Sequence, residues 1–464
     1  MIKLIRRFSI LSLFFVALFL LSPILLAKDA TKTQKAWTWM IYLDADNDLD
    51  PNGVKDLAEM TRVGSNDWLN IVVLMDRREL PAYLYYVEKG NARVIGSPGE
   101  LDMADKKTLV NFFKDTVASF PAERYALVVW DHGSGWELRG SSGSRGIATD
   151  ESSHHQMTTY DFCQALKEIS GHLGHKLDVL LMDACLMQMI EVAYGLRNSC
   201  AYIVGSEQGE PADGFPYDDI FAALRPEQTT PEVCRQCVEL YAASYASGSQ
   251  GVNICTQSAI DTSQLDPLRE ALDSFCNASI NGLFSQIFKE EREKVQRFNY
   301  RGHIDLRHLV QLLRARITDP AFSVAAAKLD EALGKAIIAN ATTGEQHKNA
   351  MGLAVYFPKD PRDFLGEYQW LAFAQDSLWD EMCKDYYKKI TVPALVELAI
   401  AGDPKPLVEF VKELPLVPVE WRDDFRKVVL NQLNFRLFCE EPNKFNQILY
   451  LMPILKGFSK NPTK

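Results

Sequence analysis

Two short apolar runs, each ending in polar and reactive side chains, constrain the fold of this chain more than any other feature. The first run covers residues 125–130 and leads directly into Asp131-His132-Gly133-Ser134-Gly135-Trp136. The second covers residues 177–182 and leads into Asp183-Ala184-Cys185. Runs of this length and composition are typical of strands buried on both faces, in a parallel sheet between two layers of helices. The sequence therefore predicts an α/β fold.

The histidine and the cysteine are candidate catalytic residues because each follows a strand of the predicted sheet. In open α/β sheets the functional crevice lies beyond the carboxyl ends of the strands. His132 and Cys185 would both lie there, and a thiol with a nearby proton acceptor is the minimum set for nucleophilic catalysis. Either residue alone is more often structural, since a free cysteine commonly behaves as a small buried hydrophobe. The two together favour catalysis.

The chain resembles the clostripain-type cysteine peptidases, within the caspase, gingipain and legumain group. Residues 130–136 resemble the histidine motif of that family, and residues 183–187 resemble its cysteine motif. Further similar segments lie elsewhere in the chain, at residues 39–49, 257–261 and 352–358, and residues 354–357 are expected to form one more strand. The resemblance covers roughly residues 35–390. It implies a caspase-like α/β/α sandwich with a mostly parallel central sheet.

The resemblance implies a cysteine endopeptidase that works through a dyad. Cys185 would be the nucleophile, and His132 would accept its proton and then protonate the leaving amine. The backbone N–H groups of Gly133 and Cys185 are the expected oxyanion hole, which needs preorganised donors rather than a particular side chain. No third member of a catalytic triad is evident in the sequence.

Substrate preference and maturation are also implied by the resemblance. Acidic residues of the family at the positions of Asp183 and Asp213 line the pocket for the substrate side chain before the cut. Two carboxylates there would favour arginine, whose fork of donors can pair with both, and lysine second. Self-cleavage after Arg145, in a Gly- and Ser-rich loop, would mature the enzyme. The structural alternatives are a strand-end Asp183, a turn-forming Asp213 and an ordinary surface loop.

The N-terminus predicts export. Lys3, Arg6 and Arg7 precede an apolar run over residues 8–27, as in a secretory signal peptide over residues 1–27. The run is also nearly long enough to span a bilayer, so retention as a membrane anchor is the alternative. We expect a periplasmic or secreted protein, or one anchored to the membrane by residues 8–27.

The remaining sequence predicts a helical end and few further partners. Residues 391–464 show helical patterns and form the predicted small all-α C-terminal domain. The net charge of −11 and the absence of a basic cluster after the N-terminus argue against nucleic acid as the main partner. We expect peptide or protein substrates with basic residues, and a membrane contact only if the N-terminal segment is retained.

No metal site or cofactor is expected from the residue spacing. The pair Cys234 and Cys237 has no second pair to complete a zinc site. The acidic stretch over residues 44–50 lacks the glycine and the twelfth-position acid of a calcium-binding EF-hand, and we expect it to cap a helix from about Pro51. Some clostripain relatives use calcium, so a calcium site stays open without a location. Nine cysteines are an odd number, and Cys185 is the natural one to remain unpaired.

Two other classes of protein fit parts of the sequence. One is a catalytically silent caspase-like binding protein, because a fold does not fix an activity. The other is a membrane-anchored scaffold in which the helical tail does the work. The intact histidine and cysteine motifs favour the peptidase.

Overall fold

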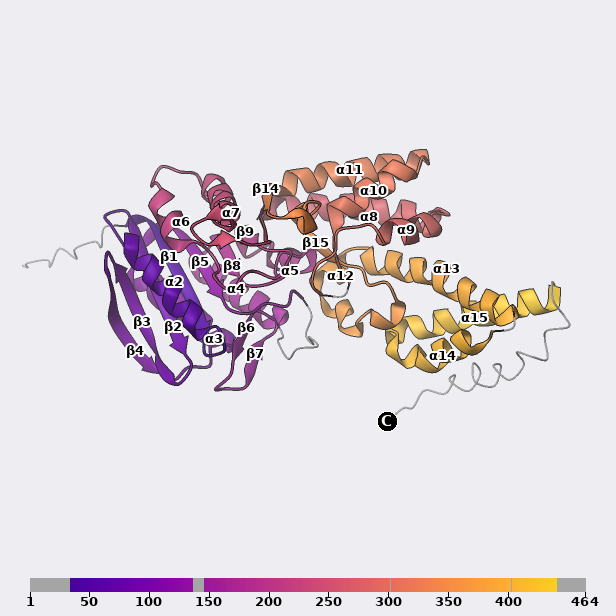
Figure 1. Cartoon of the computed structure of the whole chain (residues 1–464), viewed down its shortest axis with the longest axis horizontal. Helices are drawn as coiled ribbons and strands as arrows, with labels where there is room; N and C mark the ends of the chain where they lie inside the picture. The colour runs from indigo at the N-terminus through magenta and orange to yellow at the C-terminus, as the bar shows by residue number, and fades with distance from the viewer. Residues whose placement is uncertain (1–33, 137–145, 301, 402, 440–464) are drawn as a thin grey trace, which may run out of the picture.

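The protein is built around a nine-stranded sheet, seen at the left of Figure 1. The structure is a computed structural model, and it describes residues 34–439 except 137–145, 301 and 402. The predicted signal peptide and Arg145 therefore lie outside the described residues. From one edge to the other the strands are β14 (Ile337–Thr342), β12 (Thr256–Asp261), β9 (Cys200–Gly205), β8 (Leu177–Asp183), β5 (Ala122–Trp130), β1 (Lys35–Ala45), β2 (Leu69–Arg77), β3 (Leu80–Glu88) and β4 (Asn91–Gly99).

The centre of the sheet is parallel and its edges are antiparallel. Strands β9, β8, β5, β1 and β2 run parallel, whereas β12 and β14 at one edge and β3 and β4 at the other are antiparallel. Parallel strands need helices on both faces, which is why the central strands are mostly apolar and buried. The two apolar runs of the sequence are β5 and β8, as predicted.

Helices cover both faces of the sheet and confirm the α/β/α sandwich. In β5, Leu127 and Val129 belong to one apolar core, and Ala126 and Val128 belong to the other, because side chains alternate along a strand. The first core includes residues of α3 (Lys106–Ser119), α4 (Thr159–Leu173) and α5 (Ile190–Leu196). The second includes residues of α2 (Asp50–Val63), α6 (Tyr217–Ala223) and α7 (Thr230–Tyr245).

The register of the central strands brings three chain segments to one edge. Trp130 at the end of β5 pairs with Asp183 at the end of β8, and on its other side with Leu43 near the end of β1. The residues that follow these three strands therefore emerge together. This edge is where the sequence predicts the catalytic residues.

The rest of the chain is mostly helical and continues the first core. Its helices are α8 (Leu265–Asn281), α9 (Ser285–Arg292), α10 (Leu306–Arg316), α11 (Pro320–Ala336), α12 (Ala372–Asp376), α13 (Trp379–Ile400), α14 (Lys405–Glu413) and α15 (Val419–Cys439). They form the orange and yellow half of Figure 1. The predicted strand near residues 354–357 exists as β15 (Ala354–Tyr356), but it pairs with β13 (His303–Asp305) and not with the central sheet.

The predicted boundary at residue 390 falls inside α13, which runs unbroken through it with Pro393 in its interior. Leu407 of α14 and Phe425 of α15 belong to the same apolar core as the α5 face of the sheet. The helices after residue 390 therefore share the core of the preceding part. Among the described helices, none is both long and apolar enough to cross a membrane.

Candidate active site

The histidine and cysteine motifs are packed directly against each other. A Cβ atom added to Gly133 would lie 2.2 Å from the carbonyl oxygen of Cys185 and 3.0 Å from its nitrogen. The backbone N–H of Asp131 also donates to the carbonyl of Asp183 at 3.2 Å. Only a residue without a side chain allows this approach, which is the physical reason for a glycine after His132. The structure thus brings the two predicted catalytic segments together.

Cys185 lies in a partly buried position on a strained turn. Its Sγ accepts a hydrogen bond from the backbone N–H of Glu210 at 3.2 Å. Burial raises the pKa of the Cys185 thiol, and the nearby charge of Asp183 adds to this rise. The next residue, Leu186, has φ of 67°, a left-handed conformation that costs energy for a branched side chain. Because its pKa is raised, the Cys185 thiol is neutral at rest and needs a base to become the nucleophile.

Asp48 lies against His132 in a place that the sequence did not predict. Its Oδ1 is 2.7 Å from Nε2 of His132, and this hydrogen bond is the main cause that lowers the pKa of Asp48. A neutral imidazole that donates through Nε2 has Nδ1 free to accept a proton. Asp48 is thus placed as a third group that orients the histidine.

The expectation that this acidic stretch caps the next helix is wrong. The N-cap of α2 is Leu49, which makes no side-chain cap hydrogen bond. Asp46 instead accepts from the backbone N–H of Ser152 at 2.8 Å. The available signal for Asp48 was its place just after β1, because β1 and β5 are neighbours and end together.

Asp183 is a buried acid at the end of β8, two residues before Cys185. It is 5% exposed and accepts from the hydroxyl of Tyr217 at 2.7 Å and from the backbone N–H of Phe215 at 3.3 Å. Burial raises the pKa of Asp183 to about 6. A Cβ atom on Gly214 would lie 2.9 Å from both carboxylate oxygens of Asp183. Only a glycine therefore lets the backbone at residue 214 pack this close to the carboxylate. Above pH 6 Asp183 therefore carries a buried negative charge.

A second acid, Glu210, lies against Asp183, and the two side chains share a hydrogen bond. Burial raises the pKa of Glu210 well above its usual range, and the charge of Asp183 raises it further. Gln257 donates to its Oε1 at 3.4 Å. Two carboxyl groups this close favour a single negative charge until a cation enters. No motif in the sequence marks Glu210 beforehand.

Asp213 lies outside this pair. Its side chain is 44% exposed and its Oδ1 is 2.6 Å from Nζ of Lys55 on α2. It lies in the turn over residues 211–214, just before Gly214, and its carboxylate is paired with the lysine. The structure brings Asp183 to Glu210 and leaves Asp213 at the rim with Lys55.

The backbone donors expected to form an oxyanion hole are available. Within the described chain, the N–H groups of Gly133 and Cys185 donate to no other backbone group. Both belong to the close contact described above, so they are held by packing rather than by side chains. Such fixed N–H groups can stabilise a developing oxyanion without reorganising.

The described residues contain no group of three or more His, Cys, Asp or Glu side chains arranged to hold a metal ion. Cys234 and Cys237 lie fully buried in α7, where burial raises the pKa of both thiols. The cysteines whose side chains are described are all free. Cys234 and Cys237 therefore behave as part of the core.

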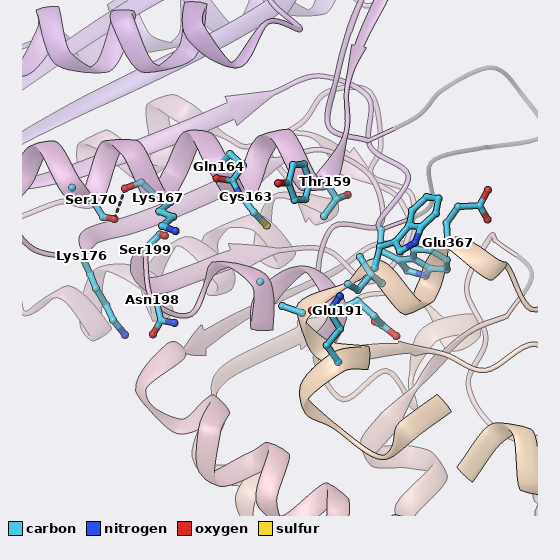
Figure 2. Close-up of a pocket in the computed structure, with 18 of the residues that line it drawn as sticks. Thr159, Cys163, Gln164, Lys167, Ser170, Lys176, Glu191, Asn198, Ser199 and Glu367 are labelled. Atoms are coloured by element: carbon cyan, nitrogen blue, oxygen red, sulfur yellow. Dashed lines mark hydrogen bonds between the residues drawn. The ribbon is translucent and has the colours of Figure 1, made fainter. Parts of the chain in front are cut away.

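A large cavity lies on the α4 and α5 face, away from the candidate site. It has a volume of 1070 Å³, and neither His132 nor Cys185 is among its lining residues. Figure 2 shows Cys163 of α4 pointing toward it, with Lys167 and Glu191 at other places on its wall. Burial raises the pKa of Cys163 to about 12, so its thiol is a poor nucleophile. Size alone therefore does not identify the active site.

The fold and the site define a caspase-like cysteine peptidase scaffold. The sequence matches the clostripain family, peptidase family C11, over residues 41–387, and the chain therefore belongs to this family. It is similar to clostripain from Hathewaya histolytica, with 31% identity over 230 residues that cover 42% of this chain and 43% of clostripain.

Solved structures share the fold. A secreted C11 cysteine protease from Bacteroides thetaiotaomicron, solved with an irreversible peptide inhibitor, has a TM-score of 0.60 and 23% identity, covering 75% of this chain and 100% of the other. An inactive zymogen C11 protease from Parabacteroides distasonis has a TM-score of 0.56 and 23% identity, covering 74% and 98%. At these identities the likeness supports the fold.

Proposed function

We propose that the protein is a cysteine endopeptidase in which Cys185 is the nucleophile and His132 the general base. The observation that carries this proposal is the contact of Gly133 with the backbone of Cys185, which joins the two motifs at neighbouring strand ends. Membership of the clostripain family supports it. Asp48 acts through His132 and is a positioning residue.

The reaction follows from these positions. His132 takes the thiol proton, and the sulfur attacks the substrate carbonyl carbon to give a tetrahedral oxyanion facing the N–H groups of Gly133 and Cys185. His132 then gives its proton to the leaving amine as the C–N bond breaks, which leaves a thioester. Water, deprotonated by His132, hydrolyses the thioester and restores the thiol. Because burial raises the pKa of Cys185, the thiol depends on His132 to take its proton.

We propose cleavage after arginine, with lysine second. The buried carboxylate of Asp183, with Glu210 beside it, offers a negative site for a guanidinium in a partly desolvated pocket. Asp213 contributes at the rim when its carboxylate exchanges Lys55 for the substrate. An incoming cation also favours loss of the proton from Glu210, because opposite charge stabilises the ionised form.

Export and maturation complete the proposal. We propose that residues 1–27 direct export and that the chain cleaves itself after Arg145. Peptides or proteins with basic residues are the proposed partners, and no cofactor is assigned. The secreted C11 relative supports an extracytoplasmic location.

The test is hydrolysis of a peptide panel that differs only at the residue before the cut. Wild type should cleave arginine peptides, Cys185→Ala should cleave none, and His132→Ala should lose nearly all activity, since thiolate formation depends on the base. Circular dichroism and thermal unfolding show whether each variant stays folded. Turnover by folded Cys185→Ala, or a preference for acidic or large apolar residues, would contradict the proposal.

A further inference from the structure

A basic cavity of 460 Å³ lies beside the candidate active site. Its basic lining residues are Arg292, Arg297, His303 and Lys359. Asp363 is the one acid among the described lining residues. In a chain with a net charge of −11, a cavity lined by three permanently charged cations, Arg292, Arg297 and Lys359, is a local feature. A small concave site with excess positive charge favours an anionic ligand.

Arg292 supports an anion site most strongly, because its guanidinium is buried and forms no ion pair with a described residue. The side chain is 2% exposed, and its Nε and Nη2 donate to the carbonyl oxygen of Phe357 at 2.8 and 2.6 Å. In the described part of the chain, Nη1 has no hydrogen-bond partner. Burial is the main reason that the pKa of Arg292 lies below its usual value. A buried charge with an unused donor is costly unless a ligand satisfies it.

The two other cations of the cavity differ in how far they are neutralised. Lys359 is 45% exposed, and its Nζ is 2.5 Å from a carboxylate oxygen of Glu293, so its charge is paired. Arg297 lies exposed at the rim and is in no ion pair within the described residues. Two guanidiniums, one buried and one at the rim, are therefore in no ion pair with a described residue, while the charge of Glu293 acts on both from outside ion-pair distance. Arginine forks match the planar carboxylate especially well.

The cavity borders the nucleophile. Asn299 lines it and is fixed by two hydrogen bonds to Gln208, at 2.7 and 2.8 Å. A Cβ atom on Gly209 would lie 2.9 Å from Nδ2 of Asn299 and 3.9 Å from Sγ of Cys185. A peptide held at Cys185 therefore runs past the wall of this cavity.

The cavity and the Asp183 pocket lie on different sides of the nucleophile. Asp183 accepts from Phe215 and Tyr217, which belong to the core on the α6 face. His303 of the cavity packs beside Gly135 on the opposite face, where a Cβ atom on Gly135 would be 3.1 Å from its Cε1. One substrate can therefore occupy both sites.

We propose that this cavity is a substrate subsite that binds a carboxylate close to the cleaved arginine. The carboxylate comes from a glutamate or aspartate side chain of the substrate, or from the free carboxyl end of a short peptide. This inference rests on the proposed peptidase function and adds a second, oppositely charged determinant to it. Preferred cleavage sequences then carry a basic residue at the cut and an acid within a few positions.

The test is peptide binding to the full chain carrying Cys185→Ala, followed by fluorescence anisotropy, so that it does not depend on turnover. Each labelled peptide contains one arginine and has an amidated carboxyl end. The three positions before the arginine and the three after it are Gln in the parent peptide, and each is replaced by Glu in a separate peptide. A second pair contains only Gln and differs in having a free or amidated carboxyl end. Replacing the arginine by alanine tests the proposed cleavage preference separately.

The variant that tests the cavity is Arg297→Ala, because Arg292 supports Phe357 and its replacement risks the fold. The matched control is Arg93→Ala, a 51% exposed arginine on the edge strand β4. At one position, the peptide with Glu should bind at least tenfold tighter than the peptide with Gln. Alternatively, the peptide with a free carboxyl end should bind at least tenfold tighter than its amidated partner. Arg297→Ala should reduce that ratio to threefold or less, Arg93→Ala should not change it, and added salt should weaken it.

The outcomes separate the two ideas. A ratio below twofold at every position, or a ratio unchanged in Arg297→Ala, overturns the carboxylate subsite. If the arginine and alanine peptides bind equally well while Glu peptides still bind tighter than Gln peptides, the proposed cleavage preference is wrong and the carboxylate subsite is supported. An effect confined to the free carboxyl end assigns the carboxylate to the peptide terminus and not to a side chain.

Discussion

Replacing Asp183 by asparagine is the sharpest perturbation of the proposed arginine pocket. The substitution keeps the shape and still accepts from Tyr217 and Phe215, but it removes the charge. Because Asp183 is 5% exposed, its charge is little screened by water. A charged hydrogen bond in such a position contributes about 1.5–3 kcal/mol. We therefore expect kcat/KM for arginine peptides to fall roughly 10- to 150-fold.

The pH dependence provides an independent part of the same prediction. Burial raises the pKa of Asp183 to about 6, so the carboxylate is charged above that pH and neutral below it. The attraction for arginine should be present above pH 6 and lost as the pH falls through 6. Asp183→Asn should lack this acidic limb. Folding raises the pKa of Asp183 from 3.8 to about 6, so the free energy of unfolding falls as the pH rises from about 4 to 6. At pH 7.5, Asp183→Asn should therefore unfold at the wild-type temperature or at a higher one.

The assay is steady-state hydrolysis of an arginine peptide between pH 5 and 8 by the wild type and two variants. The matched control is Asp213→Asn, which removes a 44% exposed carboxylate already paired with Lys55 and should cost at most a few-fold. The rate of alkylation of Cys185 by iodoacetamide should be similar in the wild type and Asp213→Asn, and no slower in Asp183→Asn, because the charge of Asp183 raises the pKa of the thiol. If Asp183→Asn has the same kcat/KM as the wild type, or if Asp213→Asn loses more kcat/KM than Asp183→Asn does, the arginine pocket is assigned to the wrong acid.

Three further outcomes follow from the site. Asp48→Ala should lower kcat about two- to fivefold with little change in KM, because Asp48 is 73% exposed and exposed ion pairs contribute about 0.2–1 kcal/mol. A loss of kcat above a hundredfold would give Asp48 a direct role in the chemistry. Gly133→Ala should abolish hydrolysis, since the added Cβ would lie 2.2 Å from the carbonyl oxygen of Cys185, and full activity in the folded variant would contradict the contact. Arg145→Ala should remain one chain by intact mass spectrometry while active wild type is two associated pieces, and whole, fully active wild type would show that processing there is unnecessary.

The sequence predicted the sheet well because the physical cause of a buried strand is local. The apolar runs before His132 and Cys185 can be satisfied only between two layers of helices, so their place at the centre followed directly. The same reasoning placed the two side chains at the carboxyl edge. It was less reliable at residues 354–357, where a short strand was predicted without its partner, since pairing depends on distant segments.

The acidic residues show the limit of local reasoning. The stretch over residues 44–50 has the composition of a helix cap, and only the alignment of β1 with β5 places Asp48 on His132. Likewise, the turn around Gly214 turns Asp213 toward Lys55, while Glu210 reaches the Asp183 pocket. Which carboxylate meets which partner is decided by contacts between segments far apart in the chain.

The sequence by itself determined the α/β class, the two central strands, and the histidine and cysteine that follow them, because hydrophobic periodicity and strand-end position are encoded in adjacent residues. The tertiary structure decided the third group on the histidine, the second acid beside Asp183, and the burial of Arg292 in the wall of the basic cavity. It also decided that the helices after residue 390 share the core of the sheet, through an unbroken α13. The physical reason is that electrostatic environment and burial depend on which distant side chains meet, and these contacts exist only in the folded chain.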